Sequence, residues 1–425
     1  MIRDHSTGVS LYQIAEKTRG NRGYLRIGLR LMVGNGWLQY RNNSYTLMPA
    51  GFNELEVAQQ LYRETVSFIP MAIFLEDFLF GESQGSLLPS LQVLVDKAKA
   101  GWGLTNEHEQ LRLQLDGMLV GPAMVALSRH GVFDMMHGIE GNQSCLSVLF
   151  DLLTHCGWVV REQSSFGLTP AGRYAASIAS AYGVTVSYLP MLSVVSTLMF
   201  GNPRIPRVDE TGVEMHVNRA TNVWGGGRAH LTYFKKVNEI VIQVFNRPIE
   251  LQPGGVCDLG CGDGTFLRHV YQVVRDNTAR GKVLDKYPLL IVGADSSKVS
   301  RRISKQNFKK AQIPNHHVIH GDINRPAQLA SDLEALGVDI HDLLHVRSFL
   351  DHNRPWLPPS GYMRGTRQSR STGAFAHLGD EILPDELEEN LVRHLRRWAP
   401  YVGRFGLLVL ELHTLPPLVT AANLE

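Results

Sequence analysis

One stretch of the chain specifies its fold class: Gly255-Val256-Cys257-Asp258-Leu259-Gly260-Cys261-Gly262-Asp263-Gly264-Thr265-Phe266-Leu267. The apolar run up to Leu259 is typical of a short buried strand, and the amphipathic pattern from Thr265 predicts a helix. Between them, three glycines let the backbone turn tightly and approach a ligand that no Cβ would admit. The Asp263 carboxylate inside this turn would repel a diphosphate. The sequence therefore predicts a strand, a ligand-binding turn and a helix.

Further apolar segments follow and predict a parallel sheet with polar residues at the strand ends. Leu289–Asp295 ends in an acid that can accept both hydroxyls of a ribose. The later segments are His317–Ile323, Val338–Phe349 and Leu407–His413. Ligands of open parallel sheets gather at the carboxyl ends of the strands. We therefore expect Asp258, Asp295, Asp322 and the segment 347–352 at one edge of the sheet.

The run Asp258-Leu-Gly-Cys-Gly-Asp-Gly-Thr-Phe266 resembles motif I of class I S-adenosylmethionine-dependent methyltransferases. In that family the turn holds the amino-acid end and the ribose side of the cofactor, and the Gly-Asp after the third strand lies beside the adenine. The resemblance implies an α/β, Rossmann-like methyltransferase core that binds S-adenosylmethionine. The cofactor-binding residues that it implies are Asp258, Gly260, Gly262, Gly264, Asp295, Asp322 and Ile323.

A glycine-rich run, Asn222–His230, interrupts a segment that otherwise has a helical pattern. Its three consecutive glycines predict a loop whose backbone closely approaches a ligand. We therefore add Trp224, Gly225 and Gly226 to the expected cofactor-binding residues. A plain flexible hinge is the alternative.

The first 180 residues contain an internal repeat. Gly36-Trp37-Leu38 is followed by a polar hairpin pattern and by Leu47-Met48-Pro49-Ala50-Gly51, and Gly157-Trp158-Val159 is followed in the same spacing by Leu168-Thr169-Pro170-Ala171-Gly172. A helical pattern precedes each copy. Helix, glycine stop, strand, turn, strand and a proline-started helix together predict two tandem winged-helix-like units.

Winged helices often bind DNA, and the first copy carries Arg19, Arg22, Arg26 and Arg30. A recognition helix needs side chains that contact bases and phosphates. The corresponding helix of the second copy, Leu146–Leu153, has no basic residue. We therefore expect a lid, dimerisation or substrate-gating role for this mainly helical region.

Composition limits the function classes. The chain has 425 residues, of which 44% are hydrophobic and 19% charged, a balance typical of folded globular proteins. A net charge of +2 is too small for a protein whose whole surface binds nucleic acid. There is no apolar run of membrane-spanning length, no start of signal-peptide type, and four cysteines are too few for a disulfide scaffold. We expect a cytoplasmic enzyme without a membrane partner.

The segment Arg347–Trp356, together with Asn222–Gly225, resembles the metal-dependent C-methyltransferase domains that open some bacterial polyketide synthase loading modules. The resemblance implies methylation of the α-carbon of a malonyl unit on an acyl carrier protein, with bound Fe(II) or Mn(II). It also implies a helical lid before the core and further synthase domains after it on the same polypeptide.

The chemistry of the acceptor agrees with this resemblance. A malonyl thioester is a poor carbon nucleophile until it is enolised, and a divalent ion stabilises the enolate. His352 is the expected metal ligand and catalytic residue, with Asp351 as a ligand or orienting group. Arg347 is the second expected catalytic residue. Glu411 and His413 are further ligand candidates, since mixed nitrogen and oxygen ligands suit iron or manganese.

We expect three parts: a tandem winged-helix-like lid at 1–180, a helical connection at 181–253 and the methyltransferase core at 254–425. The core ends directly after its fifth strand. The complete family fold needs two more strands, and a further ligand of the family, a glutamine, would follow Glu425.

Two basic segments bear on the partner. Lys298, Arg301, Arg302, Lys305, Lys309 and Lys310 recur on one face of a predicted helix, and Arg364, Arg367 and Arg370 lie in a later loop. Carrier proteins are acidic, so either segment could steer their docking. A solvated helix face and an ordinary loop are the alternatives.

Two other functions are open. The first is a small-molecule O-methyltransferase in which His352 is the general base toward a hydroxyl. The second is a methyltransferase-like regulator that binds DNA through the first winged helix. Metal dependence, methylation of a phenol without metal, and salt-sensitive DNA binding distinguish the three.

Overall fold

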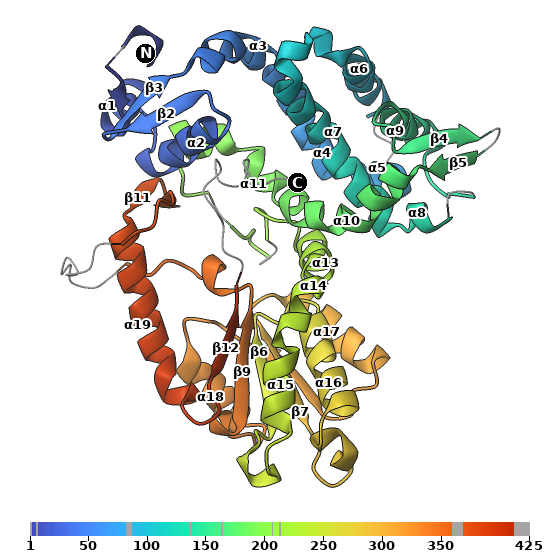
Figure 1. The fold of residues 1–425 in the computed structure, drawn as a ribbon, viewed down its shortest axis with the longest axis vertical. Coiled ribbons are helices and arrows are strands. Elements are labelled where there is room, and N and C mark those ends of the chain that lie inside the picture. The colour runs from blue at the N-terminus through green and yellow to red at the C-terminus, as the bar shows by residue number, and fades with distance from the viewer. Residues whose placement is uncertain are drawn as a thin grey trace. The chain divides into compact units, whose positions relative to one another are not determined.

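The computed structural model describes residues 2–5, 7–81, 87–135, 138–162, 165–205, 207–211, 214–358 and 369–411, so His413, Arg364 and Arg367 lie outside the described residues. The chain forms two compact units. The first comprises Met1–Gly225 and Ala374–Ile382, and the second comprises Gly226–Gly373 and Leu383–Glu425. Figure 1 shows residues up to Gly225 of the first unit in blue to green, its hairpin Ala374–Ile382 in orange-red, and the second unit mostly in yellow to red.

The first unit contains the two expected winged-helix-like repeats. The first repeat has helices α1 (Leu11–Thr18) and α2 (Arg22–Gly34), the sheet β1-β3-β2 (Val9–Ser10, Ser44–Leu47, Leu38–Arg41) and helix α3 (Pro49–Val66). The second has α9 (Gln143–His155), the hairpin β4-β5 (Val159–Glu162, Ser165–Leu168) and α10 (Pro170–Ser187).

Packing explains why both repeats keep the same glycine spacing. A Cβ on Gly51 would collide with the carbonyl oxygen of Trp37, and a Cβ on Gly172 would collide with that of Trp158. In each copy the helix after the hairpin therefore begins against the tryptophan that precedes the hairpin.

Further helices of this unit lie outside the two repeats, and one of them is long and largely buried. They are α4 (Ile69–Ile73), α5 (Leu75–Phe80), α6 (Leu88–Lys99), α7 (Glu109–Arg129), α8 (Val132–Met135), α11 (Leu189–Leu192) and α12 (Val195–Phe200). Helix α7 supplies Leu111, Leu115 and Leu119 to the core, each fully buried. No described helix is both long and apolar enough to cross a membrane.

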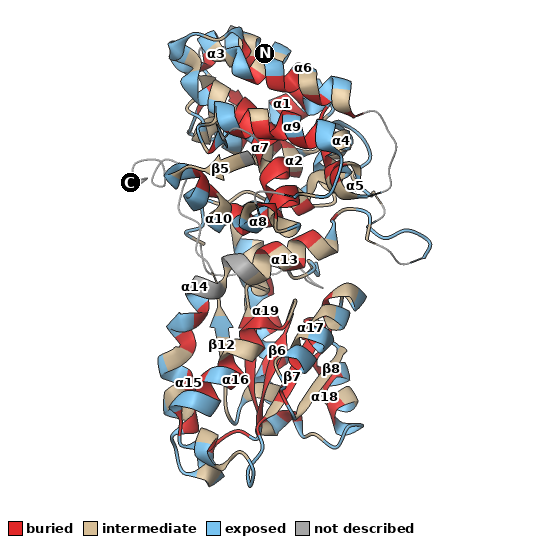
Figure 2. Cartoon of the chain, turned by 90° about the vertical axis from the view of Figure 1, so that its right-hand side faces the viewer, coloured by how far each residue is buried: buried red, intermediate tan, exposed pale blue. Residues whose placement is uncertain are grey.

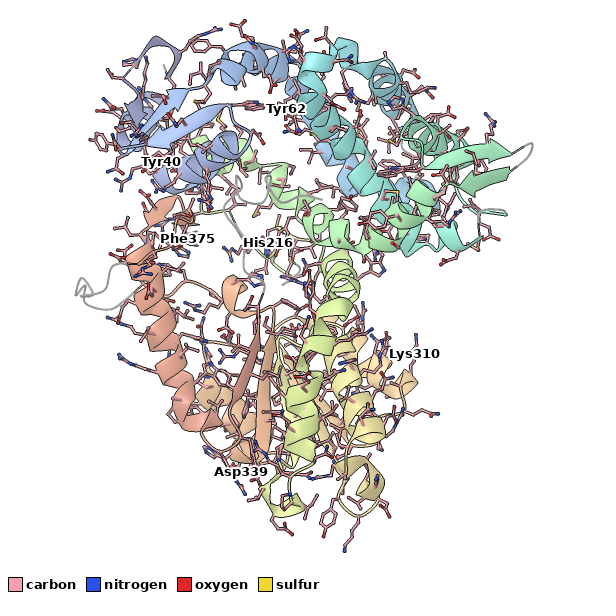
Figure 3. All side chains as sticks on the ribbon, viewed as in Figure 1. Tyr40, Tyr62, His216, Lys310, Asp339 and Phe375 are labelled. Carbon is pink, nitrogen blue, oxygen red and sulfur yellow. The ribbon has the colours of Figure 1, made fainter. Side chains whose placement is uncertain are left out.

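A hairpin from the later part of the chain belongs to this first unit. Strands β10 (Phe375–His377) and β11 (Asp380–Ile382) pack on α2, where the Gly23 N–H donates to the Gly379 carbonyl at 2.9 Å. Arg26 pairs with Glu381 at 3.1 Å. Figure 3 labels Phe375 of this hairpin and Tyr40 of β2. The helix that would enter DNA in a nucleic-acid-binding winged helix thus contacts protein at Gly23 and Arg26.

The second unit is a parallel five-stranded sheet in the order β12-β9-β6-β7-β8. The strands are β6 (Gly255–Leu259), β7 (Leu290–Asp295), β8 (His316–His320), β9 (Leu343–Ser348) and β12 (Leu407–Leu410). The first strand along the chain lies in the middle, and the order reverses between β6 and β9, as in doubly wound folds that bind ligands at this switch point. The expected class I methyltransferase fold is confirmed.

Helices cover both faces of this sheet (Figure 1). Helices α15 (Asn238–Phe245), α16 (Thr265–Asn277) and α17 (Lys298–Lys310) pack on one face, and α18 (Pro326–Glu334) and α19 (Pro384–Val402) pack on the other. Since side chains alternate along a strand, Val256 faces the first set and Cys257 the second. The central strands are therefore buried on both sides, as the red of β6 and β7 shows in Figure 2.

The expectation of a glycine-rich loop at Asn222–His230 is wrong. Residues Arg219–Ala229 form helix α13, within which the chain passes from the first unit to the second. In the first unit, a Cβ on Gly225 would lie 2.8 Å from the Val184 nitrogen, and one on Gly183 would lie 2.9 Å from the Trp224 ring. The absent Cβ atoms let α10 and α13 approach closely, a helix-packing role that the sequence does not separate from a ligand-binding one.

Candidate active site

The glycine turn after β6 has the predicted backbone. Gly260, Gly262 and Gly264 have φ values of +81°, +56° and +77°, a region that favours glycine. A Cβ on Gly260 would lie 2.8 Å from Leu350, and one on Gly264 would lie 2.5 Å from Phe308. A Cβ on Gly262 would meet no atom within 4 Å. Two glycines thus serve packing, whereas Gly262 borders open space in which a ligand can approach the backbone.

Helix α17 holds this turn from its buried face. Ser304 Oγ donates to the Gly262 carbonyl at 2.8 Å, and Asn307 Nδ2 donates to the Asp263 carbonyl at 2.9 Å. The Asp263 carboxylate accepts from the backbone N–H and the hydroxyl of Thr265 at 2.9 and 2.7 Å. Both hydrogen bonds are therefore directed at Thr265, the first residue of α16.

Two carboxylates end the central strands. Asp258 is completely buried, and its Oδ2 accepts from Ser348 Oγ at 3.4 Å. Within the described part of the chain its Oδ1 has no partner. Burial, and then the nearby charge of Asp295, raise the pKa of Asp258 well above its ordinary value. A buried acid with an unused oxygen suits a ligand that carries positive charge or hydrogen-bond donors.

Asp295 ties the second strand to the turn. Its Oδ2 accepts from the Gly262 N–H at 3.0 Å, and its Oδ1 accepts from the Ser297 N–H at 2.8 Å. These two bonds join the end of β7 to the glycine turn and to the segment that follows β7. The structure thus brings Asp258, Asp295 and Gly262 together at the carboxyl edge of the sheet.

The other predicted cofactor residues follow β8 or belong to helix α13. Asp322 follows β8, and its Oδ1 accepts from the Asn324 N–H at 2.8 Å. Ile323 is buried, and its carbonyl accepts from Trp398 Nε1 at 2.7 Å. Trp224 and Gly225 belong to the first unit, whereas Gly226 begins the second. Their contact with a cofactor stays a prediction.

The other half of the same edge is built from β9 and β12. Phe349 has an unusual φ of +56°, and its N–H donates to the Leu410 carbonyl at 2.8 Å. The chain then forms a short turn, Asp351–Asn353. Glu411, directly after β12, accepts from the Asp351 N–H at 2.7 Å and lies 2.8 Å from His352 Nδ1.

This geometry defines the state of His352. Its hydrogen bond to Glu411, and the charge of that carboxylate, raise the pKa of His352 above its ordinary value. With the Nδ1 proton held by Glu411, Nε2 is the basic nitrogen of the neutral ring. The His352 side chain is 63% exposed, so a substrate can reach it. Glu411, expected as a ligand candidate, here orients the imidazole.

His230 also belongs to this side, which the sequence did not reveal. Its ring lies 3.7 Å from the ring of Phe349, centre to centre. Burial, and then the charge of His352, lower the pKa of His230 to about 4, so its ring is neutral near pH 7. The only sequence signal was its place after the glycine run, far along the chain from His352.

Arg347 lies beneath the turn. It is fully buried, and its Nη1 donates to Asp351 Oδ1 at 3.0 Å and to His394 Nε2 at 2.9 Å. Its guanidinium lies over the Trp398 ring, 4.3 Å from the ring centre. Asp351, expected as a ligand or orienting group, has its carboxylate directed at this cluster. A catalytic role of Arg347 stays a prediction.

The metal site is not complete in the part of the chain that the structure describes. No three side chains of His, Cys, Asp or Glu there form a group that could hold an ion. His352 has the ring nitrogen and the carboxylate partner typical of a metal-ligating histidine. One candidate ligand does not make a metal site.

Comparisons with known protein families agree with this geometry. Residues 1–40, 116–202 and 214–425 match family models described as the AprA N-terminal domain, the AprA winged helix domain and the AprA MT2-like domain, the last of them a methyltransferase family. Residues 214–425 are thus similar to the AprA MT2-like methyltransferase domain. The winged-helix match falls on the second repeat, and the methyltransferase match includes the glycine turn, His352 and Glu411.

Solved structures resemble the AprA-like chain at low sequence identity. An O-methyltransferase family protein from Burkholderia thailandensis is 14% identical with a TM-score of 0.33, over 53% of this chain and 67% of its own. The citrinin polyketide synthase CMeT domain is 13% identical with a TM-score of 0.29, over 69% and 72%. Human N-acetylserotonin methyltransferase, solved in complex with SAM, is 14% identical with a TM-score of 0.31, over 59% and 72%. At these values the three structures carry no argument about activity. No curated protein matches the chain.

Proposed function

We propose that this AprA-like methyltransferase transfers a methyl group from S-adenosylmethionine to the α-carbon of a malonyl unit on an acyl carrier protein. One observation supports the methyl-transfer part of this proposal. Asp258 and Asp295, which suit a cationic ligand, lie at the carboxyl ends of β6 and β7, and the oriented His352 follows β9, which is the neighbour of β6 on the other side. The acceptor rests on the resemblance of Arg347–Trp356 to C-methyltransferase domains.

The residues at β6 and β7 suit this cofactor. When bound, it supplies an electrophilic methyl group on a sulfonium sulfur, and it also carries an ammonium and two ribose hydroxyls. Asp258 Oδ1, buried and without a partner among the described residues, would accept hydrogen bonds from such donors. Asp295 is the expected acceptor for the ribose hydroxyls, and Gly262, whose N–H it binds, leaves room beside the backbone.

His352 and Glu411 suit the acceptor. The α-carbon must lose a proton before it can attack, and His352 Nε2 is the base that takes it. Glu411 stabilises the imidazolium that forms, because its carboxylate holds the Nδ1 proton at 2.8 Å. His230 is neutral near pH 7 and so adds no positive charge beside the protonated ring.

The metal remains a separate part of the proposal. The resemblance implies Fe(II) or Mn(II), and His352 is the described residue that we expect to bind it. The same nitrogen cannot be a base and a ligand at once, so the dependence of the rate on added metal distinguishes the two roles of His352.

For the carrier we propose docking on helix α17. Its residues Lys298, Arg302, Lys305, Lys309 and Lys310 are exposed, and the helix has no acidic residue. Like charges such as Lys305 and Lys309, four residues apart, disfavour a helix. Figure 3 shows Lys310 directed outward. An acidic carrier would relieve this repulsion, and Lys305→Glu with Lys309→Glu should raise KM for a carrier-bound but not for a small thioester acceptor.

A hydroxyl acceptor is the second candidate, because the His352–Glu411 pair can also deprotonate a phenol. The deciding experiment is mass spectrometry of malonyl carrier protein incubated with S-adenosylmethionine, with and without Fe(II) or Mn(II), beside a panel of phenols. Addition of a methyl mass to the malonyl unit supports C-methylation. Methylated phenols with an unchanged carrier would replace it by O-methylation.

A further inference from the structure

Helix α19 buries an unusual row of polar side chains. Asn390, His394 and Trp398 are four residues apart, so they lie on one helix face, and they are 8%, 3% and 1% exposed. Burying polar groups costs free energy unless they are hydrogen-bonded. Their partners therefore indicate what this face is built to hold.

His394 and Trp398 face the Arg347–Asp351 pair. Arg347 Nη1 lies 2.9 Å from His394 Nε2, and because a guanidinium only donates, His394 Nε2 is the acceptor. Burial lowers the pKa of His394, in keeping with a neutral ring that accepts at Nε2. The same Nη1 donates to Asp351 Oδ1 at 3.0 Å, and Trp398 lies under the guanidinium.

Asn390 holds the chain on the other side of His352. Its Oδ1 accepts from Arg354 Nη2 at 2.6 Å, and its Nδ2 donates to the Leu357 carbonyl at 2.6 Å. Arg354 Nη1 also donates to the Asp351 carbonyl at 3.2 Å. The buried face of α19 thus contacts the segment around His352 at both ends.

Asp351 links this cluster to the base. Its side chain is held from below, while its backbone N–H donates to the carboxylate oxygen of Glu411 opposite the one beside His352. Glu411 therefore binds two consecutive residues of the turn. A displacement of Asp351 would displace the Glu411 carboxylate and, with it, the imidazole.

We propose that His394 and Arg347 are positioning residues for methyl transfer: by fixing Asp351 they fix Glu411 and so the orientation of the His352 ring. This inference rests on the proposed role of His352 as base. Arg347 then acts from beneath the turn, without touching the substrate.

The incomplete hydrogen bonding of the cluster agrees with a functional origin. Six buried side-chain atoms in the described residues have no partner, and four belong here: Arg347 Nε and Nη2, Asp351 Oδ2 and His394 Nδ1. Partly satisfied buried networks destabilise a fold. Their retention at one place fits a site whose geometry matters more than its stability.

The test compares two buried histidines of the same unit. His394→Leu removes the acceptor for Arg347, whereas His345→Leu removes an equally buried ring whose Nε2 bonds the Ile340 carbonyl at 2.9 Å. The His345 ring packs edge-on against Trp398, so this control tests whether loss of a packing contact of the cluster is enough to lower kcat. We expect kcat to fall about 10- to 100-fold in His394→Leu, with KM for the acceptor and Kd for the cofactor within a few-fold. We expect kcat of His345→Leu to match the parent.

Two further variants separate positioning from folding. His394→Gln places an oxygen near the lost Nε2 and should restore most of kcat. His394→Asn keeps a polar group, but its shorter side chain does not reach Arg347. Its kcat should fall as far as that of His394→Leu. If His394→Leu does not fold, His394→Asn still tests the positioning role.

Parental kcat in His394→Asn, equal losses in His394→Leu and His345→Leu, or no recovery in His394→Gln would each overturn the inference. His352→Ala, assayed alongside on the carrier and phenol acceptors, tests the proposed function by itself. Full activity of His352→Ala refutes the base and this inference together. Loss in His352→Ala with parental kcat in both His394→Leu and His394→Asn refutes the positioning role alone.

Discussion

The two halves of the carboxyl edge of the sheet are built in different ways. On the β6–β7 side, Asp295 and the turn are joined through backbone groups: Asp295 accepts from the Gly262 and Ser297 N–H groups, and side chains of α17 donate to the carbonyls of the turn. On the β9–β12 side, the contacts run between side chains, from Trp398 and His394 through Arg347 to Asp351, and from Glu411 to His352.

This difference has a physical consequence. Backbone-built sites need particular residues at short spacing, chiefly glycines, and they produce a recognisable motif. Side-chain networks recruit residues from distant elements, and each member has a common residue type. We therefore expect substitutions on the β6–β7 side to change the affinity for the cofactor. Substitutions on the β9–β12 side should instead change kcat.

The largest effect is expected from His352→Ala. Removal of a positioned base should lower kcat by about 10²–10⁴-fold. Cofactor affinity should stay within a few-fold, since Asp258 and Asp295 lie on other strands. Steady-state rates combined with calorimetric cofactor titration measure both quantities. A large loss of cofactor affinity in His352→Ala would show that the β9–β12 side also contributes to cofactor binding.

Asp258→Asn should weaken cofactor binding, in contrast to His352→Ala, which should mainly lower kcat. Loss of a charge-assisted hydrogen bond costs about 1.5–3 kcal/mol, or roughly 10- to 100-fold in cofactor Kd. Because the pKa of Asp258 is raised by burial, its ionisation destabilises the cofactor-free fold as pH rises above the ordinary value of the group. The variant should therefore unfold at a higher temperature than the parent at pH 7. Calorimetry and thermal unfolding check the two expectations, and a lowered midpoint would contradict the second.

Glu411→Gln should change the pH dependence. Neutral His352 is the base, so kcat rises with pH through the pKa of His352, which Glu411 raises. Without the carboxylate that pKa falls, and the rising limb moves to lower pH. The plateau kcat should drop roughly tenfold, because the ring is less well oriented. A pH–rate profile of both proteins measures the shift, and an unmoved limb would remove Glu411 from the mechanism.

The smallest effects should separate two glycines of one turn. Gly262→Ala and Gly264→Ala both suffer about 1–2 kcal/mol of backbone strain. The second also drives a Cβ to 2.5 Å from Phe308, so it should lose more stability. The first meets open space and should weaken cofactor binding a few-fold with a smaller loss of stability. Denaturant unfolding and cofactor titration measure the free energy of unfolding and the cofactor affinity of both variants. Equal losses of both quantities in the two variants would show that the ligand does not occupy the open space beside Gly262.

Much of the fold was predictable from local patterns. The two winged-helix repeats followed from a glycine and proline spacing, which the structure explains by the contacts of Gly51 and Gly172 with tryptophan carbonyls. The glycine-rich run was misread, because the same residues serve a close helix contact and a ligand-binding loop equally well. The sequence does not indicate that Arg26 on α2 forms an ion pair with Glu381, because the two residues are more than three hundred positions apart along the chain.

The sequence by itself determined the class of fold and the local structure of the β6–β7 side of the edge, because strand, turn and acid follow one another within a few residues and their spacing is a covalent property. Tertiary structure alone decided the β9–β12 side. His352, Glu411, His230 and His394 are common residues separated by long stretches of chain, and only the packing of β9, β12 and α19 shows that His394 supports a turn whose histidine is oriented by a glutamate.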